Sequence, residues 1–238
     1  MKGKVQMSTK IIISYDGTAN EEDAIVLGRL LAGAGGEVSL AYVRHNPETD
    51  SVREEIAQAE AESILDRGVE LLGISAGRYV VTDRSTPQGL AALAEREGAS
   101  LIIFCSDSHT AKGHVAVGNS AQRLLEGGRT AVAVASVDLG EQLEGRGIQQ
   151  IVAVGDADGG ARETAESLAG ALAATVTPVV NEQTDLLIVD SRPDAEPGRI
   201  SLSSSAAHLI EGATCPVIVM PRGVKLAFAG STAGVAAV

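Results

Sequence analysis

The sequence predicts an α/β protein with a doubly wound, mostly parallel five-stranded sheet, followed by a second, truncated copy of the same fold. The 238 residues are 45% hydrophobic but only 2% aromatic and lack tryptophan, so the core must be built from Val, Ile, Leu and Ala. That composition suits buried parallel strands covered by helices. Short apolar runs also alternate strictly with helical patterns from residue 10 to residue 136, and part of this pattern then recurs.

The elements of the first copy follow from local signals. Asn20 or Thr18 can cap the first helix, Gly35 and Gly36 end it, and Pro87 fits the first turn of the third helix, where its missing N–H costs nothing. The expected strands are 10–15, 37–43, 78–82, 100–105 and 130–136, and the expected helices are 19–33, 51–73, 87–97 and 118–127. This alternation predicts a five-stranded doubly wound unit.

The repetition is clearest from Ser120 onward. SAQRLLEGGRTAVAVAS and SAAHLIEGATCPVIVMP, which starts at Ser205, agree at seven of seventeen positions, where average composition gives about one. The offset is 85 here, but near the start of each copy Asp16 faces Asp156 at an offset of 140. The second copy therefore lacks 55 residues from its middle.

These offsets divide the chain. The expected parts are a full domain at 1–138, a linker at 139–149 without a sustained apolar period, a truncated domain at 150–228 and a disordered tail at 229–238. The truncated domain is expected to keep strands 150–155, 185–190 and 216–221 and helices 160–172 and 203–212. The stretch TVTPVV lies only four residues before Asp185, whereas a parallel crossover needs about a dozen. We therefore expect it to be antiparallel to its successor or not a regular sheet strand.

Charge and motifs exclude several classes of function. The net charge of −12 and the scattered basic residues argue against nucleic acid and anionic membranes as partners. No apolar run is long enough to span a bilayer, so a cytoplasmic protein is expected.

Cys105 and Cys215 lack metal or redox spacing and are interpreted as free thiols. His45, His109 and His114 are interpreted as polar loop residues rather than metal ligands. Without a catalytic triad order, a Walker lysine or HExxH, no enzyme is expected.

Three segments carry a resemblance to a known family. They are Asp-Gly-Thr at 16–18, the strand-loop-helix-strand unit at 100–136, and SRPDAEPGRISLSSSAAHLIEGATCPVIVMPRG at 191–223. The chain resembles the universal stress proteins in a tandem arrangement with a shortened second copy. The resemblance implies the adenine nucleotide alpha hydrolase-like fold and a role in the stress response. The family mixes adenine-nucleotide binders with members that bind none.

The nucleotide-binding members carry Gly-x2-Gly-x9-Gly-Ser/Thr after the fourth strand, because bare backbone must approach the phosphates at a helix N-terminus. In the first copy these positions are Cys105, Ser108 and Gly118, followed by Asn119. Two of three glycines are missing, although Asn119 and Ser120 can still cap the helix and donate to an anion.

The second copy departs further from the motif. Its positions are Asp190, Pro193 and Ser203, followed by Ser204. A proline offers no N–H to a phosphate, and the aspartate adds negative charge. Tight ATP binding is therefore not expected in either copy.

The site expected from the resemblance is the crevice at the carboxyl ends of the first and fourth strands. Its candidate residues are Asp16, Gly17, Thr18, Ser106, Ser108, Lys112, Gly118, Asn119 and Ser120. We expect a non-catalytic stress-response or ligand-sensing module with degenerate nucleotide-binding motifs and no metal. The open alternatives are weak ATP or AMP binding by the first copy and a pure interaction scaffold.

Residues 130–136 and 216–221 are apolar last strands whose edges should not be left bare, and the resemblance implies pairing through such strands. We expect them to pair within one chain as a pseudo-two-fold dimer of the two copies, with a further homodimer as an open alternative. Because the second copy has lost a helix from each face, it should depend on the first copy or on a second protomer to bury its sheet.

Overall fold

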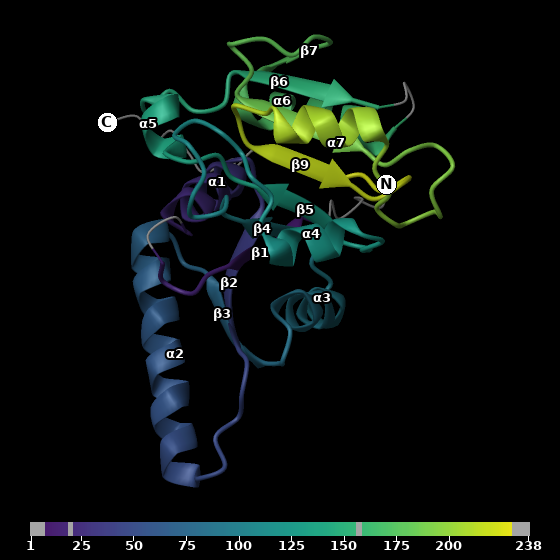
Figure 1. The fold of residues 1–238 in the computed structure, drawn as a ribbon. Coiled ribbons are helices and arrows are strands. Elements are labelled where there is room, and N and C mark those ends of the chain that lie inside the picture. Colours follow the sequence, from purple (N-terminus) through teal and green to yellow (C-terminus); the bar gives the residue numbers. More distant parts are fainter. Residues whose placement is uncertain (1–7, 19–20, 156–158, 230–238) are drawn as a thin grey trace, which may run out of the picture.

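The computed structural model describes residues 8–18, 21–155 and 159–229, which form one nine-stranded sheet with helices on both faces (Figure 1). The strands are β1 (Lys10–Ser14), β2 (Glu37–Arg44), β3 (Gly77–Thr82), β4 (Leu101–Phe104), β5 (Ala131–Val134), β6 (Gln150–Val154), β7 (Thr175–Thr177), β8 (Leu186–Asp190) and β9 (Val217–Met220). The helices are α1 (Glu21–Gly33), α2 (Ser51–Leu72), α3 (Thr86–Glu97), α4 (Asn119–Leu125), α5 (Leu139–Leu143), α6 (Gly160–Leu172) and α7 (Ser204–Glu211). Asn20, Asp156 and residues 230–238 of the predicted tail lie outside the described residues.

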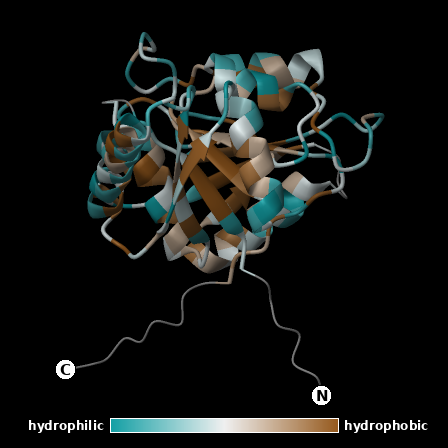
Figure 2. Cartoon of the chain, turned by 90° about the horizontal axis from the view of Figure 1, so that it is seen from below, coloured by the Kyte–Doolittle hydropathy of each residue, from teal (hydrophilic) through white to brown (hydrophobic). Residues whose placement is uncertain are grey.

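The N-terminal five strands have the predicted doubly wound arrangement. They are all parallel and run in the order β3-β2-β1-β4-β5. Successive residues of β1 point to opposite faces: Ile11 and Ile13 join the core under α1 and α2, and Ile12 joins the core under α3 and α4. Both faces of the strands are therefore covered, and Figure 2 shows their hydrophobic centre between helices.

The last strands of the two halves join the sheet together. β5 pairs antiparallel with β9 in the register Val132↔Val219, Ala133↔Ile218 and Val134↔Val217. The predicted pairing of residues 130–136 with 216–221 is thus confirmed. Beyond β9 the order is β8, β6 and β7, and these strands are parallel to one another.

The prediction for TVTPVV is wrong. β7 pairs in parallel with β6, from Gln150↔Thr175 to Val152↔Thr177, and β6 is parallel to β8, so β7 and β8 run in the same direction. The strand ends at Thr177, which leaves residues 178–185 for the return. A strand of three residues rises only about 10 Å, and eight extended residues reach about 26 Å. A short loop therefore suffices where a full-length strand would need a helix.

Residues 139–149, expected to be a plain linker, contribute to the core. They begin with α5, whose Leu139 and Leu143 are buried, and Ile148 is buried as well. All three belong to the same hydrophobic cluster as α1 and α6. The three apolar residues are too few and too irregularly spaced to predict a helix from periodicity.

The C-terminal strap, residues 224–229, covers part of the same face. Leu226 and Phe228 are 2% and 4% exposed, and their N–H groups donate to the hydroxyls of Thr164 and Ser167 on α6 at 3.0 and 2.8 Å. The strap also reaches the N-terminal half, where the Thr9 hydroxyl donates to the Ala227 carbonyl at 2.7 Å. The strap thus packs on α6 of the shortened half from within the same chain.

None of the helices in the described ranges is long and apolar enough to cross a membrane.

Candidate functional site

A pocket of about 480 Å³ opens at the carboxyl ends of β1 and β4. It is bordered by the turn before α1, the loop after β4 and the first turn of α4. The predicted site residues that line it are Asp16, Thr18, Ser106, Ser108, Gly118, Asn119 and Ser120. The further lining residues are Ser14, Glu21, Thr86, Phe104, Cys105, Asp107 and Ala121.

Two predicted site residues, Gly17 and Lys112, do not line the pocket. Gly17 forms the turn before α1 with a φ of +84°, a conformation that favours glycine. The Lys112 ammonium lies 2.7 Å from a carboxylate oxygen of Asp138 and 3.7 Å from one of Glu141. Its charge is therefore engaged at the start of α5.

Glu21 is the main pocket residue that sequence reasoning missed. It is 5% exposed, and one carboxylate oxygen accepts the N–H of Gly17 at 2.8 Å and the N–H of Asp16. Burial, together with the negative charge of Asp16, raises the pKa of Glu21 to about 8. The side chain turns back over the preceding loop instead of stabilising its own helix, and its position five residues after Asp16 was the available signal.

Asp23 connects α1 to α5. Its carboxylate accepts the N–H of Leu139 at 2.8 Å and the N–H of Asp138 at 3.0 Å. The loop after β4 is bonded to the same segment, because Gly113 donates its N–H to the Val137 carbonyl at 2.9 Å. Both walls of the pocket are thus attached to residues 137–139.

Ser106 holds the loop after β4 in place. Its buried hydroxyl donates to the Ala135 carbonyl at 2.6 Å and accepts the N–H of Ala116 at 3.1 Å. The Asp107 N–H donates to the Ala116 carbonyl at 3.1 Å. The Ser106 hydroxyl is therefore committed to the loop.

Two of the three motif positions, Cys105 and Gly118, have different environments. Burial, followed by the negative charges of Glu21 and Asp16, raises the pKa of the Cys105 thiol to about 12, so this group is neutral at physiological pH. Gly118 has an ordinary φ of −69°, and a Cβ added to it would meet no atom within 4 Å. Gly118 is the N-cap of α4, and the predicted caps Asn119 and Ser120 lie inside the helix.

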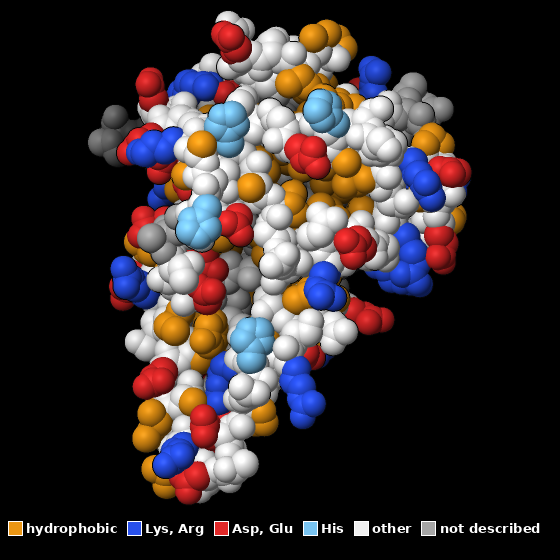
Figure 3. Space-filling model, in the orientation of Figure 1, with side chains coloured by type: hydrophobic (Ala, Val, Ile, Leu, Met, Phe, Trp, Pro, Cys, Tyr) orange, Lys and Arg blue, Asp and Glu red, His pale blue; other side chains and the backbone are white. Residues whose placement is uncertain are grey.

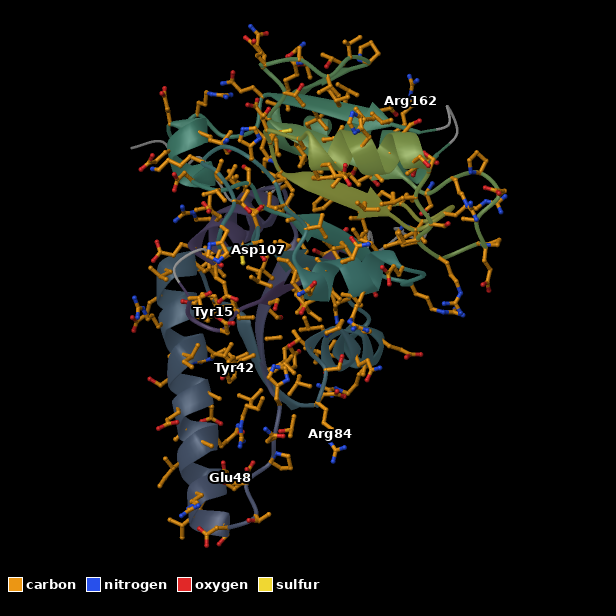
Figure 4. All side chains as sticks on the ribbon, in the orientation of Figure 1. Tyr15, Tyr42, Glu48, Arg84, Asp107 and Arg162 are labelled. Atoms are coloured by element: carbon orange, nitrogen blue, oxygen red, sulfur yellow. The ribbon has the colours of Figure 1, made fainter. Side chains whose placement is uncertain are left out.

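The pocket is acidic. Three lining residues carry carboxyl groups, Asp16, Glu21 and Asp107, and no lysine or arginine is among the described lining residues. Figure 4 labels Asp107 in the loop after β4 and Tyr15 at the end of β1. The remaining polar lining is mainly hydroxyl groups. Such a lining repels phosphate and can accept hydrogen bonds from a neutral or cationic ligand.

At the corresponding strand edge beside β6 and β8, several of the described residues contact one another closely. Asp190 accepts the N–H of Ala161 at 2.8 Å, and a Cβ added to Gly155 would lie 2.4 Å from its carboxylate. A Cβ added to Gly160 would lie 1.7 Å from the Val224 carbonyl oxygen of the strap.

Within the described ranges, no group of three or more His, Cys, Asp or Glu side chains is placed to hold a metal ion. Cys105 and Cys215 are both free.

Comparisons with known proteins identify the family. The sequence model of the universal stress protein family matches residues 7–136. None of the curated proteins matches this sequence. A functionally unknown protein from Pseudomonas aeruginosa PAO1 has a similar structure over 91% of this chain and 94% of its own, with a TM-score of 0.61 and 15% identity. A universal stress protein from Archaeoglobus fulgidus DSM 4304 matches over 91% of this chain and 100% of its own, with a TM-score of 0.57 and 17% identity. The two structural likenesses concern the fold alone, whereas the sequence match covers more than half of the chain, which therefore belongs to the universal stress protein family.

Proposed function

We propose that this chain is a non-catalytic, ligand-sensing module of the stress response whose nucleotide-binding motifs are degenerate. Residues 1–138 carry the ligand pocket, and residues 150–228 are a shortened second copy that forms a pseudo-dimer with them. The strand order supports this division, because β7-β6-β8-β9 repeats β2-β1-β4-β5 on the other side of an antiparallel junction.

The observation that carries the proposal is the acidic lining of the β1–β4 pocket. Asp16 and Asp107 line it, and no lysine or arginine is among its described lining residues. Glu21 also lines it, but its pKa is raised to about 8, so this carboxyl group is mostly protonated at neutral pH and adds little charge. Two unit charges of the same sign 6 Å apart repel by about 3 kcal/mol at an effective dielectric constant of 20. A triphosphate in this pocket would face that repulsion, and the side chains of Cys105 and Ser108 occupy positions where the family's binders have glycine.

The non-catalytic part of the proposal is supported by the state of two lining nucleophiles, Cys105 and Ser106. The Cys105 thiol is neutral because its pKa is raised to about 12, and the Ser106 hydroxyl already donates to a backbone carbonyl. Nucleophilic catalysis needs a thiolate or a hydroxyl paired with a base.

Calorimetric titration with Mg-ATP and with AMP tests the proposal. No saturable heat is expected at micromolar nucleotide. The double variant Cys105→Gly, Ser108→Gly separates the effect of the lost glycines from that of the carboxylates, which we expect to keep affinity low. A low-micromolar affinity of the unaltered chain, lost in Gly118→Val but kept in Gly170→Val on the exposed side of α6, would contradict the proposal.

Mass spectrometry of material released from the purified protein tests for the sensed ligand. A bound small molecule other than an adenine nucleotide is the expected result. A protein that releases nothing and shows no thermal shift with any metabolite would favour the pure scaffold instead.

A further inference from the structure

A second and larger cavity lies between α4 and α7, on the face of the sheet opposite α1 and α6. This α4–α7 groove has a volume of about 780 Å³, and Figure 3 shows it as a hollow with hydrophobic side chains at its base. The base is formed by Val115, Val117, Leu125, Ile200, Leu202 and Ile210. The groove and the β1–β4 pocket share no lining residue.

Backbone hydrogen bonds fix the width of the groove. Val115 donates its N–H to the Ala213 carbonyl just beyond α7, at 3.1 Å. Ile200 donates its N–H to the Gly128 carbonyl just beyond α4, at 2.8 Å, and its own carbonyl accepts the N–H of Gly127 at 3.1 Å. Each loop is thus bonded to the helix end of the other half, so the groove is formed before any partner binds.

The two arginines of the groove are already paired. The Arg192 guanidinium lies 3.2 Å from the Asp194 carboxylate, and that of Arg199 lies 2.8 Å from the Glu196 carboxylate. Arg199 also donates to the Gly127 carbonyl at 2.9 Å. In each pair the positive charge of the arginine is offset by the negative charge of its carboxylate partner.

Two exposed carboxylates remain, Glu126 and Glu211, at the carboxyl-terminal ends of α4 and α7. Glu126 accepts a hydrogen bond from Gln122 at 3.2 Å, and Glu211 lies 3.9 Å from the His208 ring. Among the described residues, no lysine or arginine forms an ion pair with either carboxylate. The helix dipoles add negative potential at these two ends. The groove therefore combines an apolar base with two negative ends.

We propose that the α4–α7 groove binds an amphipathic helix of a partner protein, with apolar side chains on the base and lysine or arginine against Glu126 and Glu211. Grooves between helices accept such a helix through apolar anchors at i, i+3, i+4 and i+7. A second copy of this chain, with a net charge of −12, has the wrong overall sign. The described chain begins at Ser8 and ends at Ala229, and both residues lie beside Gly35 at the end of α1. This helix packs on the face of the sheet opposite the groove.

The inference goes beyond the proposed function, because the groove is complete without a ligand in the β1–β4 pocket. The test uses two designed, fluorescently labelled helical peptides of about 18 residues. Both carry leucine at the anchor positions, and their flanking positions are all lysine in one and all glutamate in the other. Fluorescence anisotropy measures the affinity of the full chain for each peptide.

The full chain should bind the lysine peptide at least about tenfold more tightly than the glutamate peptide. The double variant Glu126→Lys, Glu211→Lys should reverse that preference. The matched control Glu55→Lys, Glu60→Lys makes the same change in net charge on exposed positions of α2 and should behave like the unaltered chain. Leu202→Asn, at a half-buried position of the base, should weaken both peptides.

Three results would overturn the proposal. The first is equal affinity for the two peptides or none for either. The second is an equal loss in the control and groove variants, which would assign the effect to the net charge of the chain. The third is a dimer in sedimentation that the groove variant dissociates, which would assign the groove to a second copy. Each variant's melting curve shows whether it is folded.

Discussion

The buried carboxyl of Glu21 should make the protein less stable as the pH rises. One carboxylate oxygen accepts both backbone N–H groups, from Asp16 and Gly17. The amide oxygen of glutamine can therefore keep both hydrogen bonds in the variant Glu21→Gln. The substitution removes only the ionisation of a side chain that is 5% exposed.

The size of the effect follows from the pKa of Glu21, which rises from its ordinary 4.5 to about 8 in the folded chain. Between these pH values the unfolded chain has lost the proton and the folded chain keeps it, so stability falls by about 1.4 kcal/mol per pH unit. The total loss is about 5 kcal/mol, a large part of the stability of an ordinary domain. Below pH 4.5 both states are protonated, and the contribution is constant.

Urea unfolding of the unaltered chain and of Glu21→Gln between pH 5 and pH 9 measures this contribution as a difference. Other titrating groups, such as Asp23, whose pKa is also raised by burial, are common to both proteins and cancel. The variant should be about as stable at pH 5 and several kcal/mol more stable at pH 8. Parallel pH profiles for the two proteins would refute the reasoning, because they would mean that Glu21 ionises as it does in water.

Three further predictions concern stability. Phe228→Ala removes a ring that is 4% exposed under the strap and should cost about 3–5 kcal/mol in urea unfolding, whereas a loss below 1 kcal/mol would show that the strap covers little. Arg146→Ala leaves the buried Asp185 carboxylate without its guanidinium partner and should cost about 3 kcal/mol at pH 7. Burial, the largest single cause, raises the pKa of Asp185, but the hydrogen bonds from Arg146 and from the N–H groups of Gln149 and Gln150 together lower it. The cost should therefore shrink below about pH 4, and an unchanged cost at low pH would argue against this. Gly17→Ala, at a φ of +84°, should lower stability by about 1–2 kcal/mol, and Gly118→Ala should change it by less than about 0.5 kcal/mol; equal effects would contradict the assigned backbone geometry.

The sequence was sufficient for the elements whose residues carry their own signal. β1 and β4 are apolar runs buried on both faces, Gly35 ends α1 with a φ of +93°, and Pro87 lies in the first turn of α3. The repeat at an offset of 85 predicted the β5–β9 pairing, because two apolar last strands remained to be covered. These features depend on neighbouring residues or on internal comparison.

Features that depend on distant parts of the chain could not be predicted in this way. α5 is a helix of five residues whose start is bonded to Asp23, far back in the sequence. The strap lies in place because Thr164 and Ser167 offer hydroxyl groups to its backbone. The direction of β7 was predicted wrongly because the sequence argument assumed that the strand runs through all of TVTPVV. That assumption left a return loop too short for a parallel connection.

The candidate site was likewise predictable only in part. Asp16 and Ser108 follow strands whose ends meet at one edge of the sheet, so topology places them in the pocket. Lys112 was included for its charge, but its partners are Asp138, the last residue of the predicted first domain, and Glu141, in the segment expected to be a linker. Glu21 was missed because a sequence pattern does not tell which way a side chain in the first turn of a helix points.

The loop after β4 has a defined conformation, with Cys105 and Ser108 at two positions where the resemblance to the family's nucleotide binders led us to expect glycine. Ser106 and Ser191 make the same pair of hydrogen bonds in the two halves, one to the neighbouring strand and one to a backbone N–H ten residues on. Those N–H groups belong to Ala116 and Ser201, and both residues line the α4–α7 groove rather than the β1–β4 pocket. The chain's own hydrogen bonds therefore hold these two loops beside the junction between the halves.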